Sequence, residues 1–147
     1  MVIKKMTKNE IKELWQYIEA LAEYHNSVSE HFNGMYPMDS PAQTIEMFEE
    51  DVENGRAVIF TAEEGGVTQG FIKADINKTS GAISYLFVDD QYRGEGIGDE
   101  LTGAAMTIFK EYGVKRVDVK VVYGSPTVDY YEKHGFKKQQ YIMTLSL

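Results

Sequence analysis

The chain has 147 residues, 43% of them hydrophobic, which suits one domain with a substantial core, residues 1–147, and is too short for two typical domains. It contains no cysteine, which excludes disulfides, thiolate metal sites and a cysteine nucleophile. The net charge of −8 lies almost entirely in residues 1–55, which argues against nucleic-acid and anionic-membrane partners and favours a cationic substrate, although most of these carboxylates also suit a solvated helix face.

Two amphipathic helices are predicted in the N-terminal third. Thr7 and Glu10 form a capping box, after which apolar residues recur at helical spacing to residue 25. Ser40 followed by Pro41 predicts the start of a second helix, which ends near residue 54. No stretch approaches the roughly 20 apolar residues of a membrane span and no signal core is present, so we expect a cytoplasmic protein.

A meander of three strands follows, and then a helix, a strand, a short helix and a last strand. Turn residues separate the strands, and Gly113 ends the first of these helices. The predicted strands are 57–62, 68–76, 83–88, 116–122 and 139–147, and the short helix is 127–134. The order ααβββαβαβ predicts an α/β domain with a mixed, mostly antiparallel sheet and flanking helices.

The turn between the third strand and its helix is rich in glycine. Gly94, Gly96 and Gly98 stand at alternate positions, so the backbone can approach a ligand closely with its amides outward. Because these amides lie where a helix begins, they suit phosphate or another anion. A P-loop needs Lys and then Ser or Thr after its last glycine, whereas Asp99 and Glu100 follow Gly98 here. The dinucleotide fingerprint fails as well, because its third glycine is absent.

The spacing R-x-x-G-x-G, carried by Arg93, Gly96 and Gly98 directly after a strand that ends at Val88, resembles the acetyl-CoA loop of the GNAT superfamily of N-acetyltransferases. A second string, Y-Y-E-K-H-G-F at residues 130–136, is similar to another sequence pattern of the same family. The resemblance implies the GNAT fold, in which the strand before this loop and the strand after its helix are parallel and splay apart. It also implies an enzyme that uses acetyl-CoA as cosubstrate and acetylates a primary amine by direct attack.

The resemblance assigns roles to individual residues. Phe87 and Val88 would pair through their main chain with the pantetheine arm of the coenzyme. The Val88 amide would face the thioester oxygen, and Tyr131 would donate a proton to the departing thiolate. Backbone amides of the turn would hold the pyrophosphate, and the residues of the turn are Arg93, Gly94, Glu95, Gly96, Ile97, Gly98 and Asp99.

Three positions depart from the family pattern. Val121 and Gly124 stand where many members have asparagines, and Ser84 lies near the place of a frequent glutamate. An amine with a pKa of about 10 must lose a proton before it attacks, so a base or a water relay is required. The base stays open among four candidates, which are Tyr85 acting through water, Asp118, His31 and Asp39.

The sequence also leaves open which amine accepts the acetyl group. The acidic first third favours a small-molecule or peptide amine such as a polyamine, a cationic small molecule or a protein lysine. The three histidines show no metal-ligand spacing, so no metal is predicted. A second hypothesis is an acyl-CoA-binding regulatory or sensing module without turnover, and a third is an interaction protein with a degenerate site. The strand at 139–147 offers an edge for pairing, which makes a homodimer possible.

Overall fold

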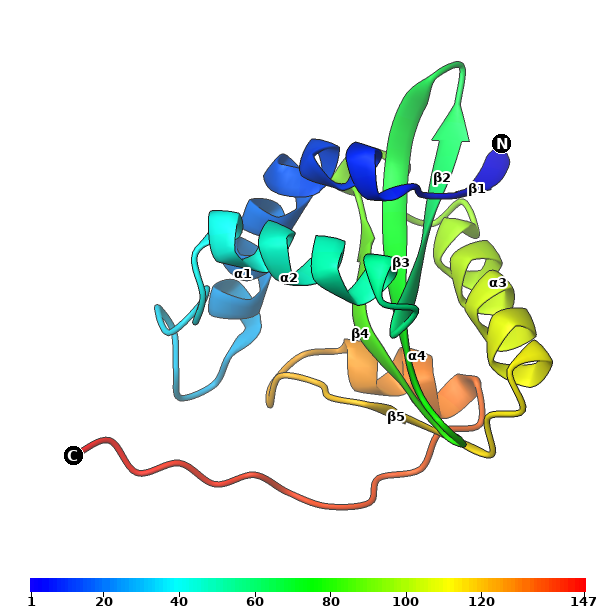
Figure 1. Cartoon of the computed structure of the whole chain (residues 1–147). Helices are drawn as coiled ribbons and strands as arrows, with labels where there is room; N and C mark the ends of the chain where they lie inside the picture. The colour runs from blue at the N-terminus through cyan, green and yellow to red at the C-terminus, as the bar shows by residue number, and fades with distance from the viewer.

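The computed structural model describes the whole chain, residues 1–147. Its centre is a five-stranded sheet in the order β1-β2-β3-β4-β5, antiparallel in its first three pairings and parallel between β4 and β5 (Figure 1). The strands are β1 Val2–Lys5, β2 Ala57–Glu64, β3 Val67–Asn77, β4 Ser80–Val88 and β5 Arg116–Val119. This mixed, mostly antiparallel sheet with flanking helices confirms the predicted fold class.

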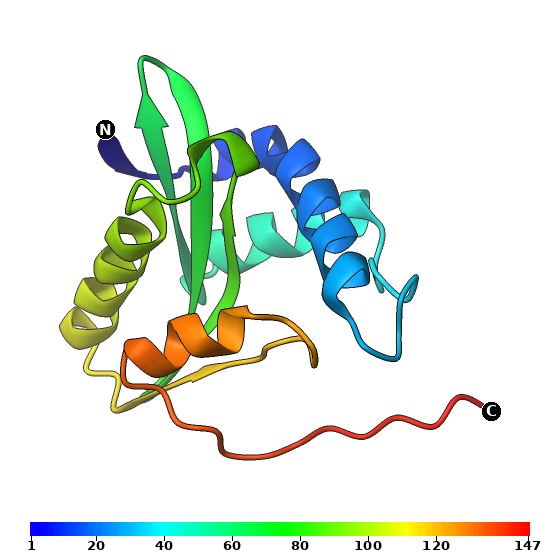
Figure 2. The ribbon, with the colours of Figure 1, turned by 180° about the vertical axis from the view of Figure 1, so that it is seen from behind.

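Helices cover both faces of the sheet. They are the 3-10 helices η1 Lys8–Leu14 and η2 Asp90–Tyr92 and the α-helices α1 Trp15–Val28, α2 Pro41–Glu53, α3 Ile97–Glu111 and α4 Thr127–Lys133. α1 and α2 lie on one face and α3 on the other, with α4 near β5 (Figures 1 and 2). Adjacent residues of β3 serve the two layers, because Phe71 packs on the α1 and α2 side and Ile72 on the α3 side. None of the helices combines the length and apolar character needed to cross a bilayer.

The N-terminus differs from the prediction in two ways. Residues 2–5 form the edge strand β1, which the sequence analysis missed because four residues show no alternation of apolar and polar side chains. The capping box is confirmed, with the Thr7 amide donating to Glu10 at 2.9 Å, but residues 8–14 form a 3-10 helix before α1 rather than one continuous α-helix. The Lys4 ammonium, 2.7 Å from Glu10, and the Thr7 hydrogen bonds lower the pKa of Glu10 to about 2.

The C-terminus also corrects the prediction. Residues 139–147 are extended and exposed but pair with no strand (Figure 1), so the last predicted strand is wrong. Met143, Leu145 and Leu147 alternate with polar residues, as in a strand. A strand also needs a neighbouring edge for its hydrogen bonds, and these residues have none. β5 is shorter than predicted and ends at Val119. The chain therefore begins with a strand and ends without one, which changes the predicted order at both ends.

A buried lysine joins α2 to the sheet. The Lys73 ammonium of β3 lies 2.9 Å from Asp51 of α2 and 2.5 Å from Asp75, and its side chain is 2% exposed. Burial opposes ionisation of Asp51, but Lys73 and Arg56 together hold the pKa of this carboxyl below its ordinary value. The buried charge is therefore paired and hydrogen-bonded, as a stable interior requires.

The feature that opens the sheet is a β-bulge in β4. Lys73 pairs with Tyr85 and Ala74 with Ile83, so Ser84 is an extra residue without a partner on β3. The pairing of β4 with β5 ends at the same place, at Ile83 and Val119. Because a bulge bends its strand and increases the local twist, the second half of β4 leaves β5 here. The two parallel strands thus separate as the sequence analysis expected.

Candidate active site

β4 leads directly into an open turn lined by glycine. After Val88 the chain forms η2, and α3 begins at Ile97. Gly94 and Gly96 have φ of +82° and +80°, a left-handed backbone that other residues disfavour. A Cβ at either position would meet no atom within 4 Å, so the space outside the turn is open. The turn offers backbone amides and a helix N-terminus to an anion.

The first turn of α3 carries the other residues predicted for this site. Ile97 is buried in the core, and Gly98 lies against α4, where a Cβ would be 3.4 Å from the Tyr130 hydroxyl oxygen. The side chains of Glu95 and Asp99 are exposed to solvent. An anion at this turn would therefore be held by main-chain amides and the helix dipole rather than by cationic side chains.

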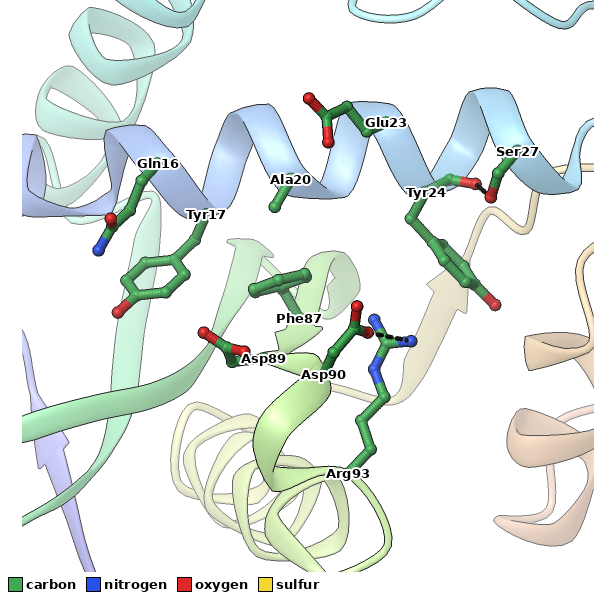
Figure 3. Close-up of a pocket in the computed structure, with 10 residues that line it drawn as sticks. All are labelled: Gln16, Tyr17, Ala20, Glu23, Tyr24, Ser27, Phe87, Asp89, Asp90 and Arg93. Carbon is green, nitrogen blue, oxygen red and sulfur yellow. Dashed lines mark hydrogen bonds and ion pairs between the residues drawn. The ribbon is translucent and has the colours of Figure 1, made fainter.

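Arg93 is the one cationic side chain of the turn, and it points away from the turn amides. Its Nε donates to the Val88 carbonyl oxygen at 3.0 Å, and a terminal nitrogen lies 2.8 Å from Asp90 (Figure 3). The guanidinium carbon lies 5.1 Å from the centre of the Tyr24 ring of α1. Arg93 therefore fastens the turn to the end of β4 and to α1.

The end of β4 presents main-chain groups on its open side. The Asp89 amide donates to the Gln69 carbonyl of β3 at 2.9 Å. Because hydrogen-bonding direction alternates along an antiparallel strand, Phe87 also turns its main chain toward β3, whereas Leu86 and Val88 turn theirs toward the gap beyond the end of β5. The sequence analysis missed Leu86, although strand alternation two residues before Val88 is the signal that points to it.

Tyr131 of α4 combines a buried ring with a free hydroxyl. Its residue exposure is 8%, and its ring packs edge-on against Tyr130 and Phe136 at centroid distances of 5.2 and 5.5 Å. The hydroxyl forms no hydrogen bond within the protein. Because no side-chain oxygen of this protein is both fully buried and unpaired, the Tyr131 hydroxyl retains access to solvent. Burial raises the pKa of Tyr131. The phenol therefore stays protonated with a proton available for donation.

Tyr130 has a different role from its neighbour. Its hydroxyl lies 2.9 Å from Thr102 Oγ1 of α3, and its ring packs against His134 at 4.5 Å. His134 Nε2 in turn lies 3.2 Å from the Asp99 carboxylate at the start of α3. Tyr130 and His134 hold α4 against the first turns of α3, beside the glycine turn. These contacts make Tyr130 a structural residue.

Two of the four candidate bases lie near each other, because the charge of Asp39, after burial, raises the pKa of Tyr85. Tyr85 packs on Phe48 at 4.7 Å, and burial raises its pKa, so it would act only through a water relay. Asp118 lies exposed on β5, while His31 and Asp39 lie in the connection between α1 and α2. No three His, Asp or Glu side chains are grouped so that they could hold a metal ion.

A pocket of about 510 Å³ lies between α1 and the end of β4 (Figure 3). The Phe87 side chain contributes to it and packs on Tyr17 at 5.7 Å. Its charged groups are the Glu23, Asp89 and Asp90 carboxylates and the Arg93 guanidinium, which pairs with Asp90. The lining residues are Gln16, Tyr17, Ala20, Glu23, Tyr24, Ser27, Phe87, Asp89, Asp90 and Arg93. The sequence analysis missed the α1 members, whose signal is one helix face at residues 17, 20, 24 and 27.

The connection after α1 rests on the turn between β5 and α4. The Glu30 amide donates to the Tyr123 carbonyl at 3.1 Å, and the His31 ring stacks on the Tyr123 ring at 6.0 Å. Gly124 has φ +103°, and a Cβ there would lie 2.4 Å from the Val28 carbonyl oxygen. Only glycine fits this contact, which accounts for the absence of an asparagine at Gly124.

Comparison with known proteins gives a consistent result. The family model described as an acetyltransferase (GNAT) domain matches residues 4–142. An uncharacterized N-acetyltransferase of Methanocaldococcus jannaschii is 30% identical over 91 residues, which cover 56% of this chain and 40% of the relative. An N-alpha-acetyltransferase of Sulfurisphaera tokodaii is 32% identical over 105 residues, 62% of this chain and 63% of the relative. The matches thus span less than two thirds of the length of these curated relatives.

Solved structures share the fold over nearly the full length. The crystal structure of a predicted acetyltransferase from Clostridium acetobutylicum with acetyl-CoA superposes with a TM-score of 0.75 and covers 99% of this chain and 95% of that one. The sequence identity between the two is 16%, so the likeness concerns the fold.

Proposed function

The chain belongs to the GNAT acetyltransferase family, and from this premise we propose that it transfers an acetyl group from acetyl-CoA, the cosubstrate of the family, to a primary amine. The observation that carries the proposal is the open glycine turn at the start of α3, directly beside the free edge of β4 at Val88. In this proposal residues 1–147 act as one acetyltransferase domain.

The coenzyme would bind along the turn and the β4 edge. The amides from Arg93 to Asp99 would hold the pyrophosphate, and the left-handed Gly94 and Gly96 support this role because they leave the space outside the turn open. The main chain of Leu86 and the amide of Val88, which face the gap, suit the pantetheine arm, while the Val88 carbonyl already accepts from Arg93. The acidic side chains near the turn extend into solvent, where water and salt weaken their repulsion of the coenzyme.

The reaction would be a direct transfer. The amine nitrogen attacks the thioester carbonyl carbon, and the carbonyl oxygen gains negative charge that the Val88 amide stabilises, an interaction worth about 3 kcal/mol. The carbon–sulfur bond then breaks, and Tyr131 gives its proton to the thiolate sulfur and regains one from water. The attacking amine loses its proton to water or to a base that we leave unassigned.

The acceptor would enter the pocket beside α1. Glu23 and Asp89 give this pocket an excess of negative charge, since Arg93 and Asp90 neutralise each other. Such a pocket favours a cationic amine, so we propose a polyamine, a cationic small molecule or a protein lysine as the acceptor class.

A second candidate function is an acyl-CoA-binding sensor without turnover. The states of the four candidate bases favour it, because His31, Asp39 and Asp118 are exposed to solvent and burial keeps Tyr85 protonated.

Calorimetric titration with acetyl-CoA, followed by thiol release in the presence of polyamines, aminoglycosides and lysine peptides, separates the two functions. Binding with thiol release supports the transferase, and binding without release supports the sensor. An absence of binding would overturn both, together with the role of the glycine turn.

A further inference from the structure

The C-terminal tail, residues 139–147, exposes an unusual amount of apolar surface. Among its nine residues, five large hydrophobic side chains are at least 74% exposed: Tyr141, Ile142, Met143, Leu145 and Leu147. The tail contains no Pro and no charged side chain, the features that usually protect a free strand from pairing. Contiguous apolar surface of this kind marks a site of association.

The same chain offers a matching acceptor for a strand. β5 lies at the end of the sheet, and only its β4 side is paired. Next to it a groove of about 410 Å³ runs between α3, β5 and the residues that follow α4. Met106, Val117 and Phe136 supply its apolar lining. The edge and the groove together can receive a strand and its side chains.

The tail lines this groove in its own chain only with Gln139 and pairs with no strand there. Its root is fixed, because the Phe136 amide donates to the Tyr131 carbonyl at 3.0 Å and the Lys138 ammonium lies 3.7 Å from Glu132. From there the tail runs below β5 and α4 without pairing with either, and its end lies beyond the body of the fold, as both views show (Figures 1 and 2). Nine extended residues span about 30 Å, enough to reach a neighbouring molecule.

We propose that the tail of each chain pairs with the β5 edge of a second copy, so that two chains exchange their C-terminal strands in a closed dimer. The exchange is reciprocal, since every chain carries both the donor tail and the acceptor edge, and a two-fold axis satisfies both contacts.

The apolar area of the tail suits a second copy of the chain as its partner. The five large side chains of each tail are at least 74% exposed, so two exchanged tails would bury on the order of 1,000 Å² of apolar surface, close to the area of stable protein interfaces. The proposal is independent of the acetyl transfer, because neither the tail nor the outer β5 edge belongs to the proposed coenzyme site.

The first test is the mass of the full chain in solution, measured by light scattering over a dilution series. We expect a dimer, and we expect the double variant Met143→Lys, Leu145→Lys to be a folded monomer. The control variant Val67→Lys, Tyr112→Lys changes two exposed apolar residues elsewhere and should remain a dimer. A wild-type monomer at all concentrations, or a dimer that survives the tail changes, overturns the proposal.

The second test uses the absence of cysteine, which gives cross-linking a clean background. One chain carries Arg116→Cys on β5, and another carries Met143→Cys in the tail. After unfolding and refolding together, a bifunctional maleimide should join the two different chains. A chain with both changes that cross-links only within itself would show that the tail folds onto its own β5, and the exchange would be refuted.

Discussion

Arg93 donates a hydrogen bond from its Nε to the carbonyl oxygen of Val88 at 3.0 Å. The bond occupies one main-chain group on the open side of β4 and leaves the Val88 amide free. The Arg93 side chain therefore holds the end of β4 and does not contact the anion site at the glycine turn.

The first prediction concerns this contact. Arg93→Ala should weaken acetyl-CoA binding about tenfold, or ~1.4 kcal/mol, because the end of β4 and the turn lose their common fastening. Arg93→Lys should rescue it only in part, since an ammonium cannot reproduce the fork of the guanidinium. Calorimetry measures the affinity, and Arg116→Ala, at an exposed position of β5, serves as the control. Equal affinity of Arg93→Ala and wild type would show that the contact is dispensable.

The second prediction separates Tyr131 from Tyr130. Tyr131→Phe should lower kcat by about 10²-fold or more, as expected for the loss of a general acid, with acetyl-CoA affinity unchanged. Tyr130→Phe should instead cost about 1 kcal/mol of unfolding free energy, because it loses the hydrogen bond to Thr102, and should retain most of kcat. Initial rates and urea denaturation measure the two effects. Full activity of Tyr131→Phe removes it from the acid role.

A third prediction compares two glycines with nearly the same backbone. Gly96 has φ +80° and Gly66, in the turn between β2 and β3, has φ +79°, and neither has an atom within 4 Å of its Cβ position. Valine at either position should cost about 1–2 kcal/mol of stability through backbone strain. Only Gly96→Val should abolish acetyl-CoA binding, measured by calorimetry. If both variants bind equally well, the coenzyme does not occupy the glycine turn.

The fourth prediction is a pH dependence of stability. Burial lowers the pKa of His25 below the ordinary 6.5, so the unfolded chain binds this proton more readily than the folded one. The contribution of His25 to stability should therefore be complete above pH 6.5 and should decrease as the pH falls below it. Urea denaturation between neutral and acid pH should show a shallower decline in His25→Phe than in wild type, with His31→Asn as the control. Identical slopes would contradict this assignment.

The fifth prediction tests the acceptor pocket. Glu23→Gln should raise KM for a cationic amine several-fold without changing acetyl-CoA affinity, and the effect should shrink in high salt because it is electrostatic. Glu19→Gln, on the same helix but outside the pocket, is the matched control. Steady-state kinetics at two salt concentrations provide the measurement. If Glu19→Gln has the same effect as Glu23→Gln, the overall charge of α1 and not the pocket attracts the amine.

The sequence predicted the elements whose signals are local. The caps at Thr7 and Ser40, the meander and the glycine turn each depend on a few neighbouring residues, and the structure contains them all. The predictions for β1 and for the tail were wrong for the same reason. Whether Val2–Lys5 or residues 139–147 form a strand depends on a distant edge, which no local pattern reveals.

The candidate site also has parts that the local sequence predicts and parts that depend on tertiary packing. The turn could be predicted because its left-handed backbone requires glycine at Gly94 and Gly96. The fixed direction of Arg93, the free main chain of Leu86 and the pocket on α1 depend on how α1 lies over β4. Gly124 was read as a missing asparagine, whereas its cause is the Val28 carbonyl, almost a hundred residues away in the sequence.

The bulge at Ser84 shifts the alternation of side chains between the two faces of the sheet at the end of β4. Ile83 faces the α3 layer while Tyr85 and Phe87 face α1 and α2, although all three have the same parity, because one extra residue stands between them. Deleting that residue would make Ile83 and Tyr85 neighbours, so regular alternation alone would keep both faces and the pairing with β3, and only the bend and the extra twist of the bulge would be lost. Evolution can therefore vary the exposed side chain at position 84 freely, whereas the loss of that single codon would straighten the strand and narrow the gap between β4 and β5.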